Sequence, residues 1–316
     1  MHKAVLVSAL VGLSVSAFAQ TTTLTLPSST TSINEPVQSS TLKTRKVINK
    51  KFEDDQEITD AKMKADSGSL SRYSVKFSLG YYGPPVGDLS NEMQPNPDGS
   101  VGTFETALSG SVGARYRIDS KSTISVGTGV SAVTPVQGVK RYDTKNPYIS
   151  YDRNGHLFDV QMRNSYGMTY VTNPAYREIG EYAGFTLDNS LLYNIGTSRF
   201  AVGMDTSFGY YFFERGPNMK SKKEKSTGRY SVAFFPQVKY NFTDKFSTYT
   251  SLGLNFNNPR GEEDLSVLWN KILSQRVGFG YAFTRDIYIS PYFNFYPKSF
   301  TADSTTVNLS TTFSIL

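Results

Sequence analysis

The chain has 316 residues and a formal net charge of +6, with 14% aromatic and 19% charged residues and no cysteine. So much Phe and Tyr with so little charge excludes a chain that is disordered throughout, because these side chains must be buried in a core or in lipid. The lack of cysteine excludes disulfide scaffolds, thiolate metal sites and thiol nucleophiles. Beyond the N-terminus no apolar run approaches the roughly 20 residues of a transmembrane helix, which excludes a polytopic helical membrane protein.

Residues 1–19 have the pattern of a secretory signal peptide. Lys3 precedes an apolar stretch that ends in Ala-Phe-Ala, which predicts cleavage before Gln20. Cleavage leaves His156 as the sole histidine, and zinc sites usually combine several His or Cys ligands. We therefore expect no metal and no cofactor.

Residues 20–70 are predicted to form a linker with a short helix. The first part, residues 20–40, is rich in Thr and Ser, which is typical of a flexible linker. Over about residues 53–66, acidic residues come early and lysines late, as suits a helix dipole, and Gly68 is placed to end the helix. This segment is a solvated spacer or, alternatively, a helix that binds a partner or plugs a barrel.

From residue 72 onward apolar and polar residues alternate with a period of two, as in strands with one apolar and one polar face. Tyr73, Val75 and Phe77, for example, alternate with Ser74 and Lys76. Ten antiparallel strands are predicted, because the pattern recurs over residues 104–118, 123–133, 185–195, 200–212, 230–242, 246–256, 273–283, 287–295 and 307–315.

The connections between these strands alternate in length. Short connections of turn-forming residues lie at residues 119–121, 196–198, 243–245 and 284–286. Longer polar connections lie at residues 83–103, 134–177, 214–229, 257–270 and 298–304. One end of the sheet therefore carries turns and the other carries loops.

This arrangement over residues 71–316 resembles the outer-membrane β-barrels of Gram-negative bacteria, which have an even strand count, short periplasmic turns, long outer loops, an apolar lipid face and a polar lumen. The resemblance implies an outer-membrane protein with extracellular loops and both termini in the periplasm, and a monomer. It implies as partners the outer-membrane lipid, lipopolysaccharide and the barrel insertion machinery. Large aromatic residues near strand ends would form interfacial girdles: Phe104, Tyr116, Tyr193, Phe200, Tyr240, Phe242 and Phe246.

Two alternative folds remain. A soluble sandwich or lipocalin-like barrel would turn its apolar face inward. Side-chain volume argues against this fold, because the apolar faces carry large aromatics near strand ends, as in interfacial girdles, and the opposite faces carry Gly, Ser, Thr, Asn and charges. A barrel of twelve strands is the other, because residues 148–162 contain Arg153, Asn154 and Gly155 as a potential hairpin turn. The charges in residues 140–153 favour a hairpin outside the membrane, so ten strands is the main prediction.

Strand parity assigns several charged residues to the lumen. Lys76, Asp188, Asp205 and Arg276 are predicted to form a charge layer or a gate. Asp188 and Asp205 should be near neighbours across a tight turn, where two carboxylates need a cation, a shared proton or a bound ion. Pairing with Lys76 and Arg276 would give a neutral layer, whereas the functional interpretation is a cation-selective constriction. Further basic lumen residues near the periplasmic ends are Arg115, Arg117 and Lys239.

The outer loops offer a basic cluster and one histidine. The cluster could pair with anionic headgroups or phosphates, or only solubilise its loop: Lys220, Lys222, Lys223, Lys225 and Arg229. It lacks the interleaved aromatics of a nucleic-acid site. Ten strands also resemble the omptin proteases, but His156, in a predicted outer loop, lacks their Asp-x-His spacing, so no enzyme is expected.

Two functions follow from these observations. The first is a porin-like channel of low conductance for small solutes. The second is a non-conducting structural or surface-interaction barrel. Its outer loops would form a binding surface, and its N-terminal extension would contact peptidoglycan or a periplasmic protein. Ten strands leave a small interior, although small residues on the inner faces would leave some space. Whether the lumen is open or plugged, and which solute it takes, the sequence leaves open.

Overall fold

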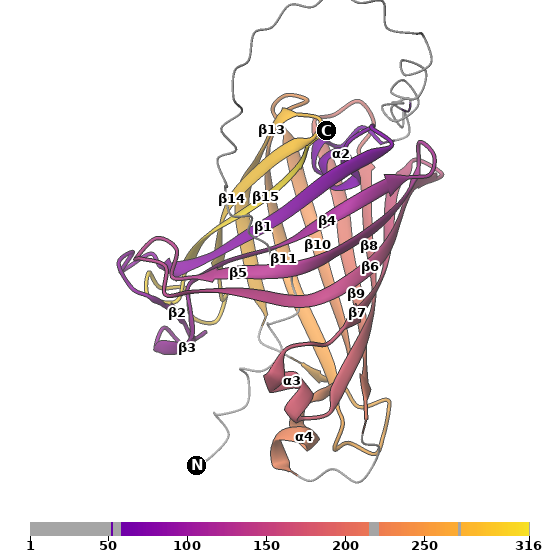
Figure 1. The fold of residues 1–316 in the computed structure, drawn as a ribbon. Coiled ribbons are helices and arrows are strands. Elements are labelled where there is room, and N and C mark those ends of the chain that lie inside the picture. Colours follow the sequence, from indigo (N-terminus) through magenta and orange to yellow (C-terminus); the bar gives the residue numbers. More distant parts are fainter. Residues whose placement is uncertain (1–51, 53–57, 215–220, 271–272, 316) are drawn as a thin grey trace, which may run out of the picture.

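The computed structural model describes Phe52 and residues 58–214, 221–270 and 273–315. The predicted signal peptide and the Thr/Ser-rich linker lie outside these residues. Within the described part, the chain folds into one antiparallel ring of strands that closes on itself (Figure 1).

The described strands of the ring are β1 (Tyr73–Pro85), β4 (Ala107–Arg117), β5 (Ser122–Val133), β6 (Arg141–Leu157), β7 (Val160–Tyr170), β8 (Glu181–Asn194), β9 (Phe200–Phe213), β10 (Gly228–Asn241), β11 (Phe246–Pro259), β13 (Ser274–Thr284), β14 (Ile287–Phe295) and β15 (Thr306–Ile315). Outside the ring proper lie β2 (Met93–Pro95), β3 (Val101–Glu105), β12 (Trp269–Asn270), α2 (Ala61–Ser67), α3 (Pro174–Glu178) and α4 (Lys222–Ser226).

Each strand of the ring pairs with its neighbours in the sequence, and β1 pairs with β15 to close the barrel. At this seam Phe77 is opposite Phe313, and the two rings stack with their centroids 4.7 Å apart. Closure leaves no strand edge of the ring unpaired, which is the condition for a β-structure in lipid.

The prediction of ten strands is wrong: the described residues form a ring of twelve, as the alternative reading had it. The two additional strands, β6 and β7, lie in the segment assigned to a long outer loop. Their turn is at residues 158–159, where Phe158 has a φ of 53°, and not at Arg153 to Gly155. Charge misled the prediction, because Lys145 and Asp152 face the lumen, where they find polar partners and need not enter lipid.

The exterior of the ring is apolar and the interior polar. Outward-facing Val126, Ile149 and Phe279 are 57%, 50% and 49% exposed. The inward positions of β4 and β5 are mostly Ser and Gly, with Arg115 and Arg117 near their ends. An apolar outer surface around a polar interior is the inverse of a soluble protein and fits a barrel surrounded by lipid.

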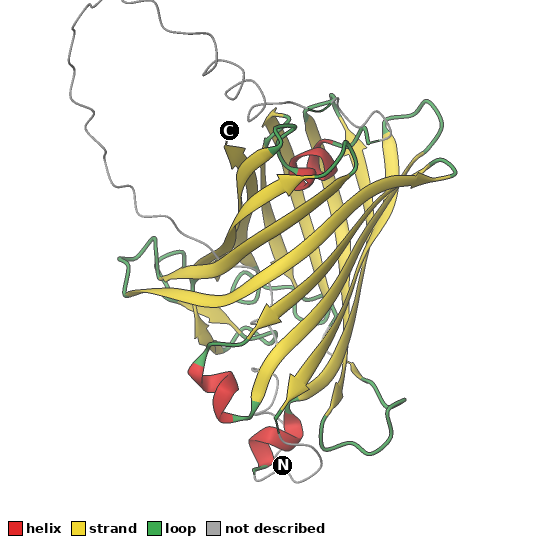
Figure 2. Cartoon of the chain, turned by 45° about the vertical axis from the view of Figure 1, so that its right-hand side comes forward, coloured by secondary structure: helices red, strands yellow, loops and turns green. Residues whose placement is uncertain are grey.

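The two ends of the barrel differ as the connection lengths indicated. One, the turn end, carries the short turns and the described end of β15; the other, the loop end, carries β2, β3, α3 and α4 (Figures 1 and 2). His156 lies near the turn end, beside the β6–β7 turn, and not in an outer loop as predicted. Helix α2 is found inside the barrel at the turn end. Of the described helices, none has the length and apolar character to cross a membrane.

An arginine in the middle of the outer surface should destabilise the barrel. Leu252 faces outward halfway along β11 and is 38% exposed. We expect Leu252→Arg to lower the free energy of unfolding by about 2–4 kcal/mol, because the charge would enter the bilayer midplane. The measurement is reversible denaturant unfolding in lipid vesicles.

Phe283→Arg is the matched control, because Phe283 lies near the turn end of β13 and is 53% exposed. Near the membrane surface the same change should cost only about 0–1 kcal/mol. Equal losses for the two variants would contradict the placement of the lipid-facing belt.

Candidate functional site

Residues 58–69, which we call the plug segment, occupy the turn end of the lumen. The segment includes α2, which is shorter than the predicted helix because it begins after Asp60, whose carboxylate accepts a hydrogen bond from Met63 N at 2.9 Å. Gly68 ends the helix with a φ of 71°, a conformation that favours glycine. The sequence placed the end of the helix correctly. Residues 58–60 are not helical, and the first part of the predicted helix, residues 53–57, lies outside the described residues.

Apolar side chains of the plug segment pack against the barrel wall. Ile58 and Met63 are 1% and 4% exposed and contact Leu192 and Ala201. Ala65 is fully buried against Ala282 of β13 and Tyr288 of β14. The segment therefore touches two separate parts of the barrel wall, and these contacts bury only a few side chains.

The N-terminal end of the plug segment is held by one ion pair and one amide. Asp60 pairs with Lys239 of β10, and the two side chains are 6% and 7% exposed. The Gln161 side-chain oxygen accepts hydrogen bonds from the backbone N–H groups of Thr59, at 2.8 Å, and Asp60, at 3.0 Å. Gln161 comes from β7, so the two contacts anchor this end to different sides of the ring.

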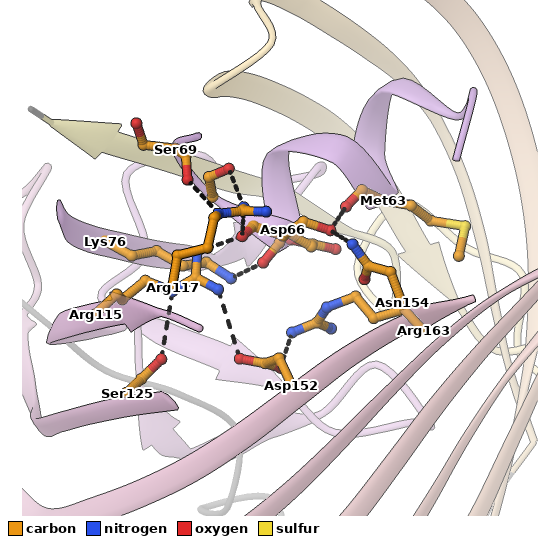
Figure 3. A network of polar contacts seen from close by, with 12 residues as sticks. Met63, Asp66, Ser69, Lys76, Arg115, Arg117, Ser125, Asp152, Asn154 and Arg163 are labelled. Carbon is orange, nitrogen blue, oxygen red and sulfur yellow. Dashed lines mark hydrogen bonds and ion pairs between the residues drawn. The ribbon is translucent and has the colours of Figure 1, made fainter. Parts of the chain in front are cut away.

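The C-terminal end is held by cations that bind backbone carbonyl oxygens (Figure 3). Lys76 donates to the carbonyl oxygen of Asp66, and Arg115 donates to that of Ser67 at 2.6 Å. Arg117 donates to Ser69 O at 2.9 Å, to Ser67 O at 3.0 Å and to Gly68 O at 3.2 Å. Arg285, from the β13–β14 turn, also donates to Gly68 O, at 2.5 Å. Cations at the C-terminal end of a helix are favoured by its dipole.

Side-chain contacts complete the attachment of α2. Asn154 donates to Ser67 Oγ at 2.7 Å, and Ser67 Oγ donates to Met63 O at 2.8 Å. Asp66 pairs with Lys62 at 3.0 Å and accepts from Thr312 Oγ1 at 3.1 Å. These contacts connect the plug segment to most strands of the ring: β1, β4, β6, β7, β8, β9, β10, β13, β14 and β15.

The charges of the plug segment depend on this enclosure. Burial raises the pKa of the Asp60 carboxyl, but the charge and hydrogen bond of Lys239, the hydrogen bond from Met63 N and the charge of Lys62 together lower it by more, so the pKa lies below its ordinary value of 3.8. Burial likewise raises the pKa of Asp66, and Lys62, Lys76 and Arg163 together lower it by more, again with a net decrease. Both carboxylates therefore favour docking of the plug above their ordinary pKa, and that contribution is lost as pH falls through their lowered values.

The predicted charge layer is split between different partners. Lys76 contacts the plug segment, and Arg276 lies over the rings of Phe235 and Tyr292 at 5.1 and 5.6 Å. Asp188 accepts a hydrogen bond from Ser207 at 2.6 Å. Asp205 of β9 lies directly opposite Ser190 of β8, and Ser190 is two positions from Asp188 on the same strand. The two aspartates are therefore diagonal and not direct cross-strand neighbours.

Arg163 is the cation that the sequence analysis missed. It pairs with Asp152 at 2.5 Å and is attracted electrostatically to Asp188 and Asp205. Asp152, Asn154, Gln161 and Arg163 all lie on β6 and β7. The alternation of Tyr166, Met168 and Tyr170 with Ser165, Gly167 and Thr169 was the available signal for these strands.

The structure describes only part of the basic cluster predicted for the third outer loop. Lys220 lies outside the described residues, and Lys222, Lys223 and Lys225 belong to the short α4 at the loop end. Arg229 instead donates to Arg260 O at 3.1 Å and to Glu262 O at 2.9 Å, which fastens β10 to the loop after β11. In the described residues, no group of three or more acidic or His side chains could hold a metal ion.

A closed antiparallel ring with an apolar exterior, a polar lumen and loops at one end defines this chain as a β-barrel of the outer-membrane type. No protein-family model and no curated protein matches its sequence.

Among solved structures, the COG4313 outer membrane channel from Pseudomonas putida F1 is similar, with a TM-score of 0.47 and 12% identity over 79% of this chain and 98% of that one. The NanC porin gives a TM-score of 0.43 and 8% identity over 77% of this chain and 100% of that one. Omp33 from Acinetobacter baumannii gives 0.37 and 12%, over 77% and 98%. The assignment to this class rests on the architecture of the barrel itself.

Removal of Lys239 should loosen the plug. Because the chain has no cysteine, Ser67→Cys introduces a single thiol at a position that is 3% exposed. In this background, Lys239→Met leaves Asp60 buried without its cation. A penalty on the order of 3 kcal/mol for a broken buried pair should accelerate maleimide labelling of the thiol by roughly 100-fold.

Two controls define this result. Asp60→Asn with Lys239→Met should label more slowly than Lys239→Met alone, because no buried charge is then unpaired. Lys245→Met, in an exposed turn at the same end, should leave labelling unchanged. Equal labelling of all variants would contradict the anchoring role of the pair. Without these substitutions, the labelling rate divided by that of a free thiol at the same pH should stay low from about pH 5 to 8. It should rise only as pH falls below the ordinary pKa of 3.8 toward the lowered values of Asp60 and Asp66.

Proposed function

We propose that this protein is a narrow channel for small solutes in the outer membrane of a Gram-negative bacterium, and that its plug segment closes the channel at the turn end. The observation that carries the proposal is the position of residues 58–69, which lie within the lumen and contact strands all around the ring. The loops face the cell exterior in this proposal, and the turn end faces the periplasm.

The nature of the plug contacts supports a channel over a purely structural barrel. Most of them are hydrogen bonds and ion pairs, whereas the apolar contacts involve the small set Ile58, Ala61, Met63 and Ala65. Water can replace polar partners when a segment leaves, so releasing such a plug costs less than disrupting an apolar core of equal size. The inward side chains of the wall behind it, on β4 and β5, are mostly small.

Removal of the plug segment should open the channel. A variant that lacks residues 20–69 should show larger stepwise currents in planar bilayers than the full chain, because the turn end is then unobstructed. Heat-modifiable electrophoretic mobility checks that the shortened barrel is folded.

The possible results separate the two functions. Equal currents in both proteins would contradict the plug, and the absence of stepwise currents from both would favour the non-conducting barrel.

The acidic side of the lumen should influence which ions pass. In the same plug-deleted background, we expect Asp188→Asn with Asp205→Asn to lower the K⁺ to Cl⁻ permeability ratio, because Arg163 would lose two compensating charges. Reversal potentials in a KCl gradient measure this ratio. Glu105→Gln with Glu92→Gln, which removes two carboxylates that pair with Lys140 in the loops, is the control. An unchanged ratio in the aspartate variant would contradict a selectivity role for this pair.

A further inference from the structure

The residues that hold the C-terminal end of the plug segment form a site of their own. We call Lys76, Arg115, Arg117 and Arg285 the cationic cradle. Their donors converge on the carbonyl oxygens of four consecutive residues, 66–69. Arg115 and Arg117 are only 4% and 2% exposed, so these guanidinium groups are held away from bulk water.

The charge of the cradle exceeds what the plug offers it. The carbonyl oxygens at a helix end amount to about half a negative elementary charge, whereas the cradle carries four cations. The carboxylates nearby are Asp152, 3.7 Å from Arg115 Nη2 and also paired with Arg163, and Asp286, 3.3 Å from Arg285 Nη1. The plug adds the carboxylate of Asp66, which is attracted to Lys76 and Arg115 but is itself paired with Lys62. A full anion would balance the cradle better than neutral peptide groups do.

Two buried groups at the cradle also point to a different occupant. Within the described residues, Arg115 Nη2 and Ser314 Oγ have no hydrogen-bond partner. Both residues adjoin Gly68: a β-carbon there would lie 1.5 Å from Arg115 Nη1 and 3.1 Å from Ser314 Oγ. An oxyanion offers several acceptor oxygens from one centre, and guanidinium forks match carboxylate and phosphate geometry.

We propose that the cationic cradle is a binding site for carboxylate or phosphate groups, which the plug carbonyls occupy when the lumen is closed. The plug and an oxyanion then compete for the same donors. Because the cradle lies in the solute path, the channel favours anionic small solutes once the plug has left; this last step rests on the proposed function.

The test uses the full chain with the plug displaced. Gly68→Val combines a β-branched residue at positive φ with a clash against Arg115, while every cradle side chain is retained. Gly155→Val is the matched control, because its β-carbon meets nothing within 4 Å and its φ is not positive.

Binding is measured first, without reference to current. Inorganic phosphate and, separately, acetate replace chloride at constant ionic strength, and the thermal unfolding midpoint is recorded. We expect both oxyanions to raise the midpoint of Gly68→Val and to have little effect on Gly155→Val, whose cradle remains occupied. A response to phosphate alone would identify phosphate as the group bound, and a response to acetate alone would identify carboxylate.

Removal of the cradle donors must abolish this response. Adding Arg115→Gln and Arg117→Gln to Gly68→Val should weaken oxyanion binding by about tenfold or more, since charge-assisted hydrogen bonds are lost. Adding Arg199→Gln and Lys245→Gln, which removes two exposed cations of the turns, should leave the binding unchanged. Equal oxyanion binding by these two combined variants would contradict the assignment of the cationic cradle as the binding site.

Planar bilayer currents then separate the cradle from the channel. We expect Gly68→Val to be anion-selective and its current to be reduced by millimolar phosphate or acetate, with the block weakened about tenfold by Arg115→Gln and Arg117→Gln. If neither oxyanion changes the current or the unfolding midpoint, the oxyanion site is contradicted, whereas the proposed channel is still supported by the current itself. If phosphate or acetate raises the unfolding midpoint of a protein that passes no current, the proposed channel is contradicted, whereas the oxyanion site is supported.

Discussion

Closure of the strand ring is the constraint on which the rest of the structure depends. In lipid each backbone N–H and C=O group needs a partner within the protein, and pairing of β1 with β15 provides the last of them. Closure makes every other residue face lipid and the residues between them face a confined lumen. That lumen gives Arg115, Arg117 and Lys239 a polar environment within the membrane, and it gives the plug segment a site in which to dock.

Much of this fold could be predicted from the sequence, because lipid-facing residues must be apolar and lumen-facing residues can be small. The alternation identified all strands of the ring in the described residues except β6 and β7. Those two were assigned to a loop because charges were taken to exclude a membrane strand. Asp152 shows why this reasoning fails: it faces inward and pairs with Arg163 on the neighbouring strand. Charge argues against a strand only when parity places it on the lipid face.

The site was less predictable for a different physical reason. Parity placed Arg115, Arg117 and Lys239 at the turn end, where the structure has them, but it could not name their partners. Arg115 and Arg117 bind backbone carbonyl oxygens, which every residue carries, so no side-chain pattern marks the contact. Asp60 and Lys239 are 179 positions apart, and their pairing depends on where α2 enters the lumen. Gly68 alone gave a local signal, because a helix that ends at positive φ favours glycine.

The two ends of the plug segment are held by different kinds of charged contact, so departure of the segment would leave different charges exposed at each end. At Asp60 a carboxylate meets an ammonium group, so separation of the pair exposes one charge of each sign. At residues 66–69 the plug supplies peptide carbonyls and the barrel supplies cations. Departure of the plug therefore leaves Lys76, Arg115, Arg117 and Arg285 in the lumen with less negative charge beside them than before. In the proposed channel, the groups that hold the plug segment are thus the same groups that would set the charge of the lumen after it leaves.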